Sequence, residues 1–565
     1  MRWSIYALAF AFFAVFLLLP VGTAVVAGIT DPATGQLTGA FLREALADPL
    51  HREGLLNALA IACVTTVLTA GIALPVAWVM ARTVFPGKPL AEVLLLAPLI
   101  LPPFVGALGF EAVLGRHGAL NALLVQAGLI GWDDPPDWLG SHRFAAICLI
   151  ESLHLYPFLY LTAAASISRL DPALIEAARI GGAGPWTVFR RIWLPLLRPG
   201  LFAGGVVIFV WSFTELGTPL MLGYDRHVAV QIYAGLAEAE KNRLPFAQVI
   251  VMLAVAAAAY VAARALFAKA ERALAAKGTH SGTPRRLTGP AAVGAWLLIG
   301  AVCALAAAPH AAVAVLAVAQ DWYRSVLPSG LTVTHLRDAL VHPQVVSSIL
   351  QSLKYSALAT TLALVLGTYV AWATVRWRPR GWQALDLLAM LPLAIPGIIL
   401  AFGYRALPSL RIADVAPFGW LNPVVEPTML IALAYGVRRL PYVVRAAAAG
   451  YEQTPVALEE AAAISGAGAF VRLRRIVLPL LAASLAAGAI LAFSFSMLEV
   501  ADSLILAERR EHWPITKVMF GLTDILGNGP AIACAFATWA MLFLAAAFAA
   551  AQALSGRRLG SAMRA

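Results

Sequence analysis

Charged residues are scarce in this chain. Only 13% of its 565 residues are charged, whereas 61% are hydrophobic. A soluble domain usually carries about a quarter charged residues, so this share excludes a soluble globular protein. Apolar runs of about 20 residues, long enough to cross a bilayer, recur along the chain. The first covers residues 5–28, and a similar run at 291–319 lies mid-chain, where no signal peptide belongs. We therefore expect both to be retained membrane spans.

Cysteine and catalytic motifs are also missing or rare. The chain has no G-x-x-x-x-G-K-[ST] phosphate loop, and no Ser/His/Asp or Cys/His arrangement within a soluble framework. We therefore expect no catalytic residue, no metal site and no cofactor in this chain. The cysteines lie in apolar runs, without metal-like or disulfide-like spacing, and we interpret them as small hydrophobic side chains. They are Cys63, Cys148, Cys303 and Cys534.

The net charge of +11 is distributed in a way that argues against nucleic-acid binding. Lys and Arg gather in short loops between apolar runs, as the positive-inside rule describes for cytoplasmic loops. With these loops on the cytoplasmic side, the rule predicts about twelve spans and two cytoplasmic termini. The basic clusters are Arg82 with Lys88; Arg190, Arg191 and Arg198; Lys269, Arg272, Lys277, Arg285 and Arg286; Arg376, Arg378 and Arg380; Arg472, Arg474 and Arg475; and Arg557 with Arg558.

The chain contains an internal repeat. Pro98 is matched by Pro392, 294 residues later, and Glu176 is matched by Glu460, 284 residues later. The change of offset assigns ten additional residues to the loop at 115–142 of the first half. Fixed spacing between similar segments indicates a duplicated structural unit.

The repeat predicts an all-α polytopic membrane protein with about twelve transmembrane helices in two parallel six-helix repeats. An even number of spans gives both halves the same orientation, and the interface between them is the natural place for a pathway. Proline-rich turns are expected to kink or interrupt the third span of each half. The expected boundaries are a first transmembrane domain at 1–268, a cytoplasmic linker at 269–290, a second transmembrane domain at 291–556 and a cytoplasmic tail at 557–565.

One cytoplasmic loop occurs in both halves. It reads EAARIGGAGPWTVFRRIWLPLL from Glu176 and EAAAISGAGAFVRLRRIVLPLL from Glu460. Each copy predicts a short helix, a glycine that ends it, a second short helix with basic residues, and a proline that opens the next span. Such a helix–turn–helix has the shape to dock into a groove of a soluble partner.

Both loops resemble the EAA loop of binding-protein-dependent ABC importer permeases, with E-A-A, three residues, Gly, nine residues and I-x-L-P. The resemblance covers essentially the whole chain, because two six-span halves also resemble the fused permeases for ferric iron, thiamine and aminoethylphosphonate. It implies the type I ABC importer permease fold and a multi-pass place in the bacterial inner membrane, in contact with lipid. The residues that it implies as contacts for two ABC ATPase subunits are Glu176, Ala177, Ala178, Gly182, Glu460, Ala461, Ala462 and Gly466.

The resemblance also implies partners and a cargo. Two copies of the ATPase subunit would bind and hydrolyse ATP with Mg²⁺, so this chain would be no enzyme, and an extracytoplasmic binding protein would deliver the solute. Ferric iron is the favoured cargo, with aminoethylphosphonate, thiamine or a polyamine as alternatives. An ion-gradient-driven secondary transporter, which needs no duplicated coupling loop, and a non-transporting scaffold for an ATPase complex are the rivals from other classes. The external loop at 115–142 is either a docking surface for the binding protein or a lid.

Ionisable residues inside spans mark candidates for a translocation pathway, because placing them there is costly. The acidic ones either face the pathway or pair with a basic residue or cap a helix break. The arginines either meet an anionic substrate or neutralise nearby carboxylates. Both alternatives stay open at this point. The ionisable candidates are Glu215, Glu499, Asp502, Arg438 and Arg439, and Ser212 and Ser496, on the turn before the two glutamates, complete the set.

Overall fold

The computed structural model describes residues 2–100, 103–140, 142–168, 170, 172–239, 241–274, 285–410, 415–525 and 527–555. Residues 275–284 of the expected linker and the whole expected tail lie outside the described residues. The chain forms two compact units, which are described one at a time. Unit 1 comprises Met1–Ala45, Ile232–Ile250 and Leu336–Ala565, and unit 2 comprises Leu46–Gln231 and Val251–His335.

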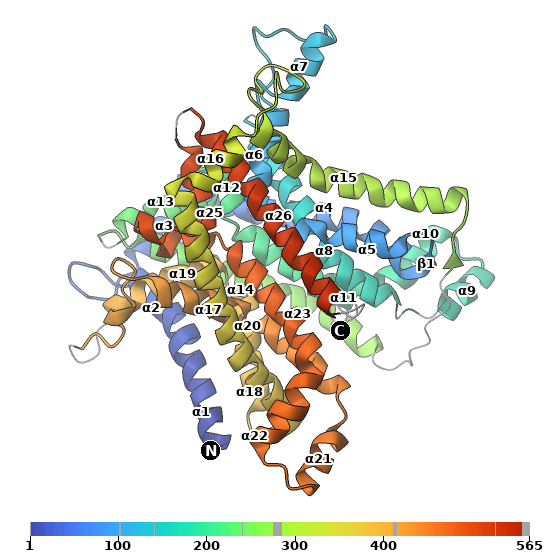
Figure 1. Ribbon diagram of the computed structural model, residues 1–565, viewed down its shortest axis with the longest axis vertical. Helices are drawn as coiled ribbons and strands as arrows, with labels where there is room; N and C mark the ends of the chain where they lie inside the picture. The colour runs from blue at the N-terminus through green and yellow to red at the C-terminus, as the bar shows by residue number, and fades with distance from the viewer. Residues whose placement is uncertain are drawn as a thin grey trace. The chain divides into compact units, whose positions relative to one another are not determined.

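Unit 2 is helical apart from two short strands. Its elements are α4 (Pro49–Arg82), β1 (Thr83–Val84), α5 (Lys88–Leu96), η2 (Ala97–Ile100), α6 (Pro103–Leu114), α7 (Ala119–Gln126), α8 (Arg143–Ser168), α9 (Pro172–Ile180), α10 (Pro185–Val188), η3 (Phe189–Trp193), α11 (Leu194–Phe213), α12 (Gly217–Met221), β2 (Arg285–Arg286) and α15 (Pro290–Val318). The strands pair in parallel, with Thr83 opposite Arg285. At the top of Figure 1, α7 extends beyond the end of α6.

Unit 1 has the corresponding order. Its elements are α1 (Arg2–Phe13), η1 (Ala14–Leu18), α2 (Leu19–Gly28), η4 (Gly235–Glu238), α17 (Pro343–Trp372), η5 (Ala373–Trp377), α18 (Trp382–Met390), η6 (Leu391–Leu393), α19 (Gly397–Ala406), η7 (Leu407–Ser409), η8 (Gly419–Leu421), α20 (Thr428–Gln453), α21 (Val456–Ile464), α22 (Ala469–Arg472), η9 (Leu473–Val477), α23 (Leu478–Met497), α24 (Ala501–Leu506), η10 (Arg510–His512), α25 (Ile515–Thr523) and α26 (Gly529–Ser555). Helices that run across a boundary between segments of the two units are α3 (Ala40–Ala47), α13 (Val228–Ala234), α14 (Leu244–Leu274) and α16 (Thr334–Val341).

Several helices have the length and composition of membrane spans. Among the described residues, nine helices qualify, and the number rises to eleven if each of two bent pairs is one span. Helix α20 stands where the repeat expects the tenth span, but it carries Arg438, Arg439 and Arg445, so it is less apolar than the others. If α20 is added to the eleven, the number of spans agrees with the prediction of about twelve.

The third span of each half is bent at its prolines, as the sequence predicts. In unit 2, Lys88–Leu99 and Pro103–Gln126 meet at 91°, and in unit 1, Trp382–Leu393 and Gly397–Ser409 meet at 100°. Proline removes a backbone donor and clashes with the preceding turn, so helices break or kink there. A turn of 3-10 helix precedes each bend, at η2 and η6.

The first span of each half belongs to the compact unit of the other half. In unit 1, α2 packs against α19, and Gly403 lies against the backbone of Pro20. In unit 2, α15 packs against α6, and Gly109 lies against the backbone of Pro309. The expected domain boundaries follow the sequence repeat, whereas the compact units exchange these two spans.

Each unit has a core of three helices. In unit 2, α4, α8 and α11 pack on one another, and in unit 1, α17, α20 and α23 do the same. Small residues set the close approach at equivalent places: Gly204 faces Leu159 of α8, and Gly488 faces Val443 of α20. Without a hydrophobic driving force between helices in lipid, such close backbone packing is a main source of association.

Candidate functional site: two repeated loops and a buried ion network

The first repeated loop begins with α9, which ends in a tight backbone turn. The amide of Gly182 donates to the carbonyl of Arg179 at 3.0 Å, and the amide of Ala183 donates to that of Ala178 at 2.9 Å. This pair of bonds is the Schellman motif, which needs a left-handed residue at the glycine position. Gly182 has φ +80°, a left-handed conformation that favours glycine over residues with a side chain.

The second loop has the same turn at the end of α21. The amide of Gly466 donates to Ala463 at 3.0 Å, and the amide of Ala467 donates to Ala462 at 2.9 Å. Gly466 has φ +82°, and open space surrounds the position where its Cβ would be. The position of the glycine in both loops therefore has a local physical reason, because it is the left-handed C′ residue of the motif.

The loop residues expected to contact a partner are accessible. Glu176, Ala177 and Gly182 are exposed in the first loop, and Ala178 is half-buried. In the second loop, the equivalent set has the same pattern, with Ala462 half-buried and the others exposed: Glu460, Ala461 and Gly466.

Two large apolar side chains of each loop are also strongly exposed. Ile180 and Ile464 are both 88% exposed, while Trp186 is 70% and Phe470 is 72% exposed. The members of each pair are 284 residues apart, so both loops present the same apolar pair. Sequence reasoning singled out the motif letters and missed these residues, although their matched positions in the repeat were a usable signal.

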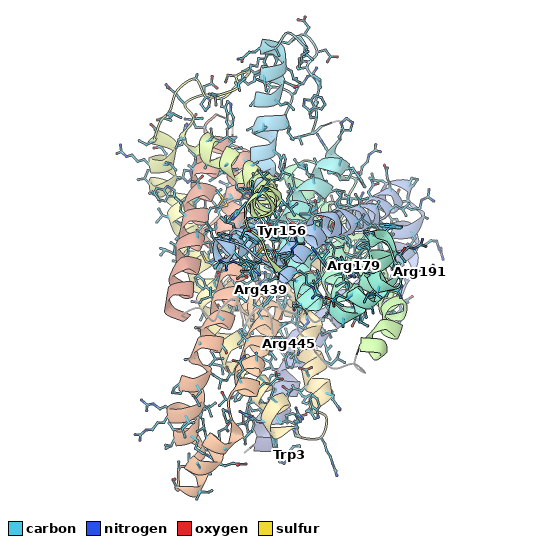
Figure 2. The ribbon with its side chains drawn as sticks, turned by 90° about the vertical axis from the view of Figure 1, so that its right-hand side faces the viewer. Trp3, Tyr156, Arg179, Arg191, Arg439 and Arg445 are labelled. Atoms are coloured by element: carbon cyan, nitrogen blue, oxygen red, sulfur yellow. The ribbon has the colours of Figure 1, made fainter. Side chains whose placement is uncertain are left out.

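The second short helix of each loop continues directly into the following span. Helix α10 joins α11 through the π-turn η3, and α22 joins α23 through η9. Pro195 and Pro479 lie in the first turn of their spans, as expected. A π-turn accommodates an extra residue in a helix, so the short helix and the span form one element. Arg191, at the edge of the helices in Figure 2, projects from η3.

In unit 1, four of the pathway candidates form one ion network. Nη1 of Arg438 lies 2.5 Å from Oε1 of Glu499 and 3.2 Å from Oδ2 of Asp502. Arg439, which Figure 2 labels among the helices, pairs with Oε2 of Glu499 and donates to the carbonyl of Phe495 at 3.1 Å. The carboxylates are only 6% and 0% exposed, so the arginines neutralise charges that burial would otherwise make very costly.

The backbone of the same region is held by a chain of hydroxyl groups. The carbonyl of Glu499 accepts hydrogen bonds from Oγ1 of Thr516 at 2.6 Å and from Oγ of Ser503 at 2.5 Å. The hydroxyl of Tyr435 contacts Ser503 at 2.6 Å. Ser496 is buried next to this network, and its Oγ has no hydrogen-bond partner within the described part of the chain.

In unit 2, the equivalent glutamate has a different environment. Oε1 of Glu215 accepts from the amides of Gly217 at 3.1 Å and Thr218 at 3.4 Å, and Trp211 donates to its other oxygen at 3.2 Å. Glu215 therefore caps the start of α12. Ser212 donates to the buried carboxyl of Glu151, a contact that the repeat does not reproduce in unit 1. Pairing and capping are thus the observed environments of the two glutamates.

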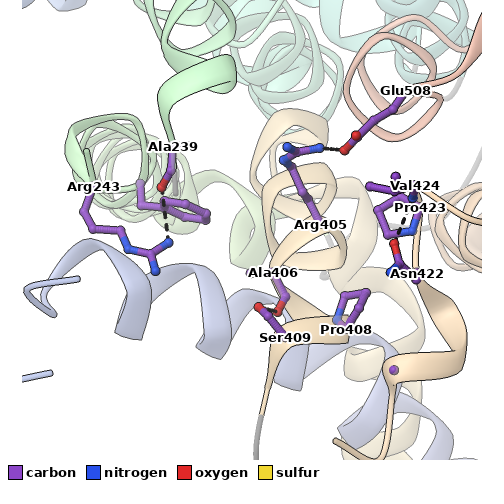
Figure 3. Close-up of a pocket in the computed structure, with 12 residues that line it drawn as sticks. Ala239, Arg243, Arg405, Ala406, Pro408, Ser409, Asn422, Pro423, Val424 and Glu508 are labelled. Atoms are coloured by element: carbon purple, nitrogen blue, oxygen red, sulfur yellow. Dashed lines mark hydrogen bonds and ion pairs between the residues drawn. The ribbon is translucent and has the colours of Figure 1, made fainter. Parts of the chain in front are cut away.

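Unit 1 also contains a cavity of about 290 Å³. Figure 3 shows Arg405 paired with Glu508, and Arg243 donating to the carbonyl of Ala239 at 3.2 Å. Phe246 lies under the guanidinium of Arg243 at 5.4 Å. No group of three or more metal-ligating side chains occurs within the described ranges.

Two long segments of the chain match a known protein family. Residues 57–273 and 363–555 match the family described as "Binding-protein-dependent transport system inner membrane component". The chain belongs to this family. The two matched regions fall in the two halves of the repeat, and each contains one complete loop with its apolar pair. In this permease family, ATP hydrolysis belongs to separate ATPase subunits, and the permease is a transport protein of the inner membrane.

Three relatives illustrate the range of the family. An ABC transporter permease protein of Sinorhizobium fredii is 28% identical over 413 residues, covering 70% of this chain and 69% of the relative. A ferric transport system permease protein of Actinobacillus pleuropneumoniae is 24% identical over 450 residues, with 78% and 62% covered. A spermidine/putrescine transport system permease protein of Escherichia coli is 33% identical over 165 residues, with 29% and 58% covered.

Proposed function

We propose that this permease imports ferric iron, delivered by an extracytoplasmic binding protein and driven by two ATPase subunits that dock on the two repeated loops. The matched exposed faces of those loops carry this proposal. Each presents an acidic residue, a left-handed glycine turn and an apolar pair with nearly equal exposure. Exposed apolar groups at a polar loop are typical of interaction sites.

Two equivalent loops in one chain imply two docking events. A duplicated docking element with the same local geometry fits two copies of one partner better than two different partners, because each copy meets the same surface. The basic residues beside both loops assign them to the cytoplasmic side, where ATP is present. The same rule assigns both termini to the cytoplasmic side.

Ferric iron is favoured as the cargo among several alternatives. A relative named as a ferric transport permease aligns over 78% of this chain, whereas a polyamine permease aligns over 29%. Aminoethylphosphonate and thiamine are alternative cargoes, because the two six-span halves also resemble the fused permeases for these solutes. The binding protein selects the solute in such systems, so the cargo is a property of the assembled system.

The ion network supports a stabilising role for Glu499 and Asp502 more than direct contact with a cation. Their charges are already balanced by Arg438 and Arg439, and a cationic cargo would have to compete with these contacts. The pathway would then be shaped by helix packing, with the network holding one of its walls.

The proposal is tested with the permease, its ATPase and its binding protein reconstituted in liposomes. ATP hydrolysis is measured while the binding protein carries ferric iron, aminoethylphosphonate, thiamine or putrescine in turn. Stimulation by ferric iron alone supports both the class and the cargo. Stimulation by another ligand would show that this ligand is the cargo instead of ferric iron, and would still support an ATP-driven importer. Solute uptake that follows an imposed ion gradient without ATPase subunits would favour a secondary transporter, and assembly without ligand-dependent hydrolysis would favour a scaffold.

Substitutions at the loop glycines provide a second test, which addresses docking of the ATPase subunits directly. Asparagine tolerates the left-handed conformation better than other side chains, and valine does not. Open space surrounds the Cβ positions of Gly182 and Gly466, so within the permease Gly→Asn adds only the strain of a left-handed backbone, which thermal unfolding of the variants measures. A loss of ATPase binding by variants that unfold like wild type then reports a clash with a docked partner. We expect the paired Gly→Asn variants to fold and to lose ATPase binding. Normal binding by these variants would contradict docking at the turn.

A further inference from the structure

An arginine at the end of α4 holds the segment that leads into the first loop. Nη2 of Arg82 donates to the backbone carbonyl of Leu170 at 2.7 Å. Leu170 lies two residues before α9 begins, and its own side chain is buried. The guanidinium also lies over the ring of Trp78 at 5.7 Å. Arg82 thus links the last turn of the second span to the entrance of the loop helix.

The equivalent arginine does the same in unit 1. Arg376, in η5 at the end of α17, donates to the backbone carbonyl of Thr454. Thr454 also lies two residues before its loop helix, α21, and is buried. The guanidinium lies over the ring of Tyr451 at 5.7 Å. An ion pair with Glu459 at 3.2 Å adds a contact inside α21 itself.

The two links occur at matching positions of the repeat. Arg82 and Arg376 are 294 residues apart, and the two acceptor residues are 284 apart. The basic charge by itself is explained by membrane topology, which requires only that it lie on the cytoplasmic side. Topology does not require a bond to the same carbonyl in both halves, nor burial of the guanidinium, and Arg376 is only 13% exposed.

We propose that Arg82 and Arg376 are positioning residues that fasten each ATPase-docking helix to the end of the second span of its half. Displacement of a loop helix by a closing ATPase subunit would then pull directly on α4 or α17. The loop is otherwise continuous only with the spans before and after it, and α4 and α17 each pack against both of those spans. The arginine adds a polar connection between the start of the loop and the core. This inference rests on the proposed docking of ATPase subunits.

The link is stronger at the second loop. Glu459 is 21% exposed and reaches Arg376 from within α21, whereas the first loop has Ile175 at the equivalent position. The guanidinium fork can hold a carbonyl and a carboxylate at the same time, which an ammonium group does with less geometric definition. We therefore expect the second loop to move more tightly with its span than the first.

The experiment uses the complete complex in liposomes, with ferric-loaded binding protein as the probe. Iron taken up per ATP hydrolysed is compared for wild type, for the double variant Arg82→Gln with Arg376→Gln, and for the double Arg→Lys variant. The matched control is Arg380→Gln, which removes an exposed arginine from the same cytoplasmic region as Arg376. Recovery of ATPase subunits with the permease is measured for every variant.

We expect the double Gln variant to keep its ATPase subunits and to lower the uptake per ATP by about fivefold or more. The double Lys variant, which can still donate to the carbonyls, should retain most of the ratio, and Arg380→Gln should match wild type. An unchanged ratio in an assembled, transporting complex overturns the positioning role alone. An equal loss in the Arg380→Gln control, or a loss of uptake that only follows loss of subunits, also overturns it. If wild type recovers no ATPase subunit, the proposed function fails and this role fails with it.

A second measurement needs no transport. Amide hydrogen exchange in α21 should become faster in Arg376→Gln than in wild type within the assembled complex, since the helix loses two contacts with the core. Glu459→Gln, which leaves the carbonyl bond in place, should have the smaller effect. An effect of Glu459→Gln as large as that of Arg376→Gln would contradict the carbonyl link.

Discussion

Gly403 lies against the backbone of Pro20 so closely that a Cβ at the glycine would overlap the proline carbonyl oxygen. The contact joins the broken third span of the second half to the first span of the first half. In unit 2, Gly109 makes the reciprocal contact with Pro309. Each half therefore donates its first span to the other, and glycine is the residue that permits the backbones to meet.

The glycine contacts predict a stability loss. Gly403→Ala and Gly109→Ala should each lower the free energy of unfolding by about 1–3 kcal/mol, because a methyl group must displace backbone rather than a flexible side chain. Thermal unfolding in detergent checks this. Gly71→Ala is the control, because open space surrounds that helical position. A Gly71→Ala loss as large as the others would refute the packing explanation.

The ion network predicts a strong context effect at Glu499. Glu499→Ala should destabilise unit 1 by about 3–5 kcal/mol, because it leaves two buried arginines with one carboxylate. The first half has Leu155 at the position equivalent to Arg439. Adding Arg439→Leu to Glu499→Ala should therefore recover part of the lost stability. A double-mutant cycle on thermal unfolding measures the coupling. Purely additive effects would contradict a direct pair between Arg439 and Glu499.

The equivalent glutamate should respond differently. Glu215→Ala removes the acceptor for two amides at the start of α12, and the loss of such a cap costs about 0.5–2 kcal/mol. Glu215→Gln keeps an acceptor and should cost less. Thermal unfolding of Glu215→Ala, Glu215→Gln and Glu499→Ala, measured side by side, tests this ranking of the stability losses. The prediction is wrong if Glu215→Ala is the more damaging of the two alanine variants.

The exposed apolar pairs predict a binding defect without a folding defect. Ile180→Asp with Ile464→Asp should leave thermal unfolding unchanged, since both side chains are 88% exposed, and should reduce ATPase co-purification. We expect the affinity of the permease for the ATPase subunit to fall by about tenfold, which corresponds to about 1.4 kcal/mol of binding free energy. Leu327→Asp serves as the control, because Leu327 is 75% exposed in a loop outside the two repeated segments. Unimpaired co-purification of the Ile→Asp variant would remove these residues from the docking face.

Much of the fold could be predicted from the sequence because its signals are local or repetitive. Long apolar runs, proline-rich bends and the fixed offsets gave the spans, the interrupted third helices and the two halves. The loop turns were also predictable, since Gly182 and Gly466 end their helices through backbone geometry that involves only a few neighbouring residues. The expected division of the chain at the linker 269–290 follows from the repeat alone. It does not indicate which spans pack together.

The candidate site was predictable only in part. Both explanations for Glu215 and Glu499 were open, and the repeat suggested that the two residues share a role. The structure gives one a helix cap and the other two arginine partners. The difference arises because α20 carries Arg438 and Arg439 where the first half carries His154 and Leu155, and their partners are about 60 residues away in sequence.

The sequence by itself determined the class of protein, the duplicated architecture and the position of both loops, because hydrophobic length, charge placement and glycine turns act over short distances. Only the tertiary structure decided the exchange of first spans, the ion network and the arginine links to Leu170 and Thr454. Each of these depends on side chains and carbonyls brought together from distant segments. No local pattern encodes which carbonyl a guanidinium will meet.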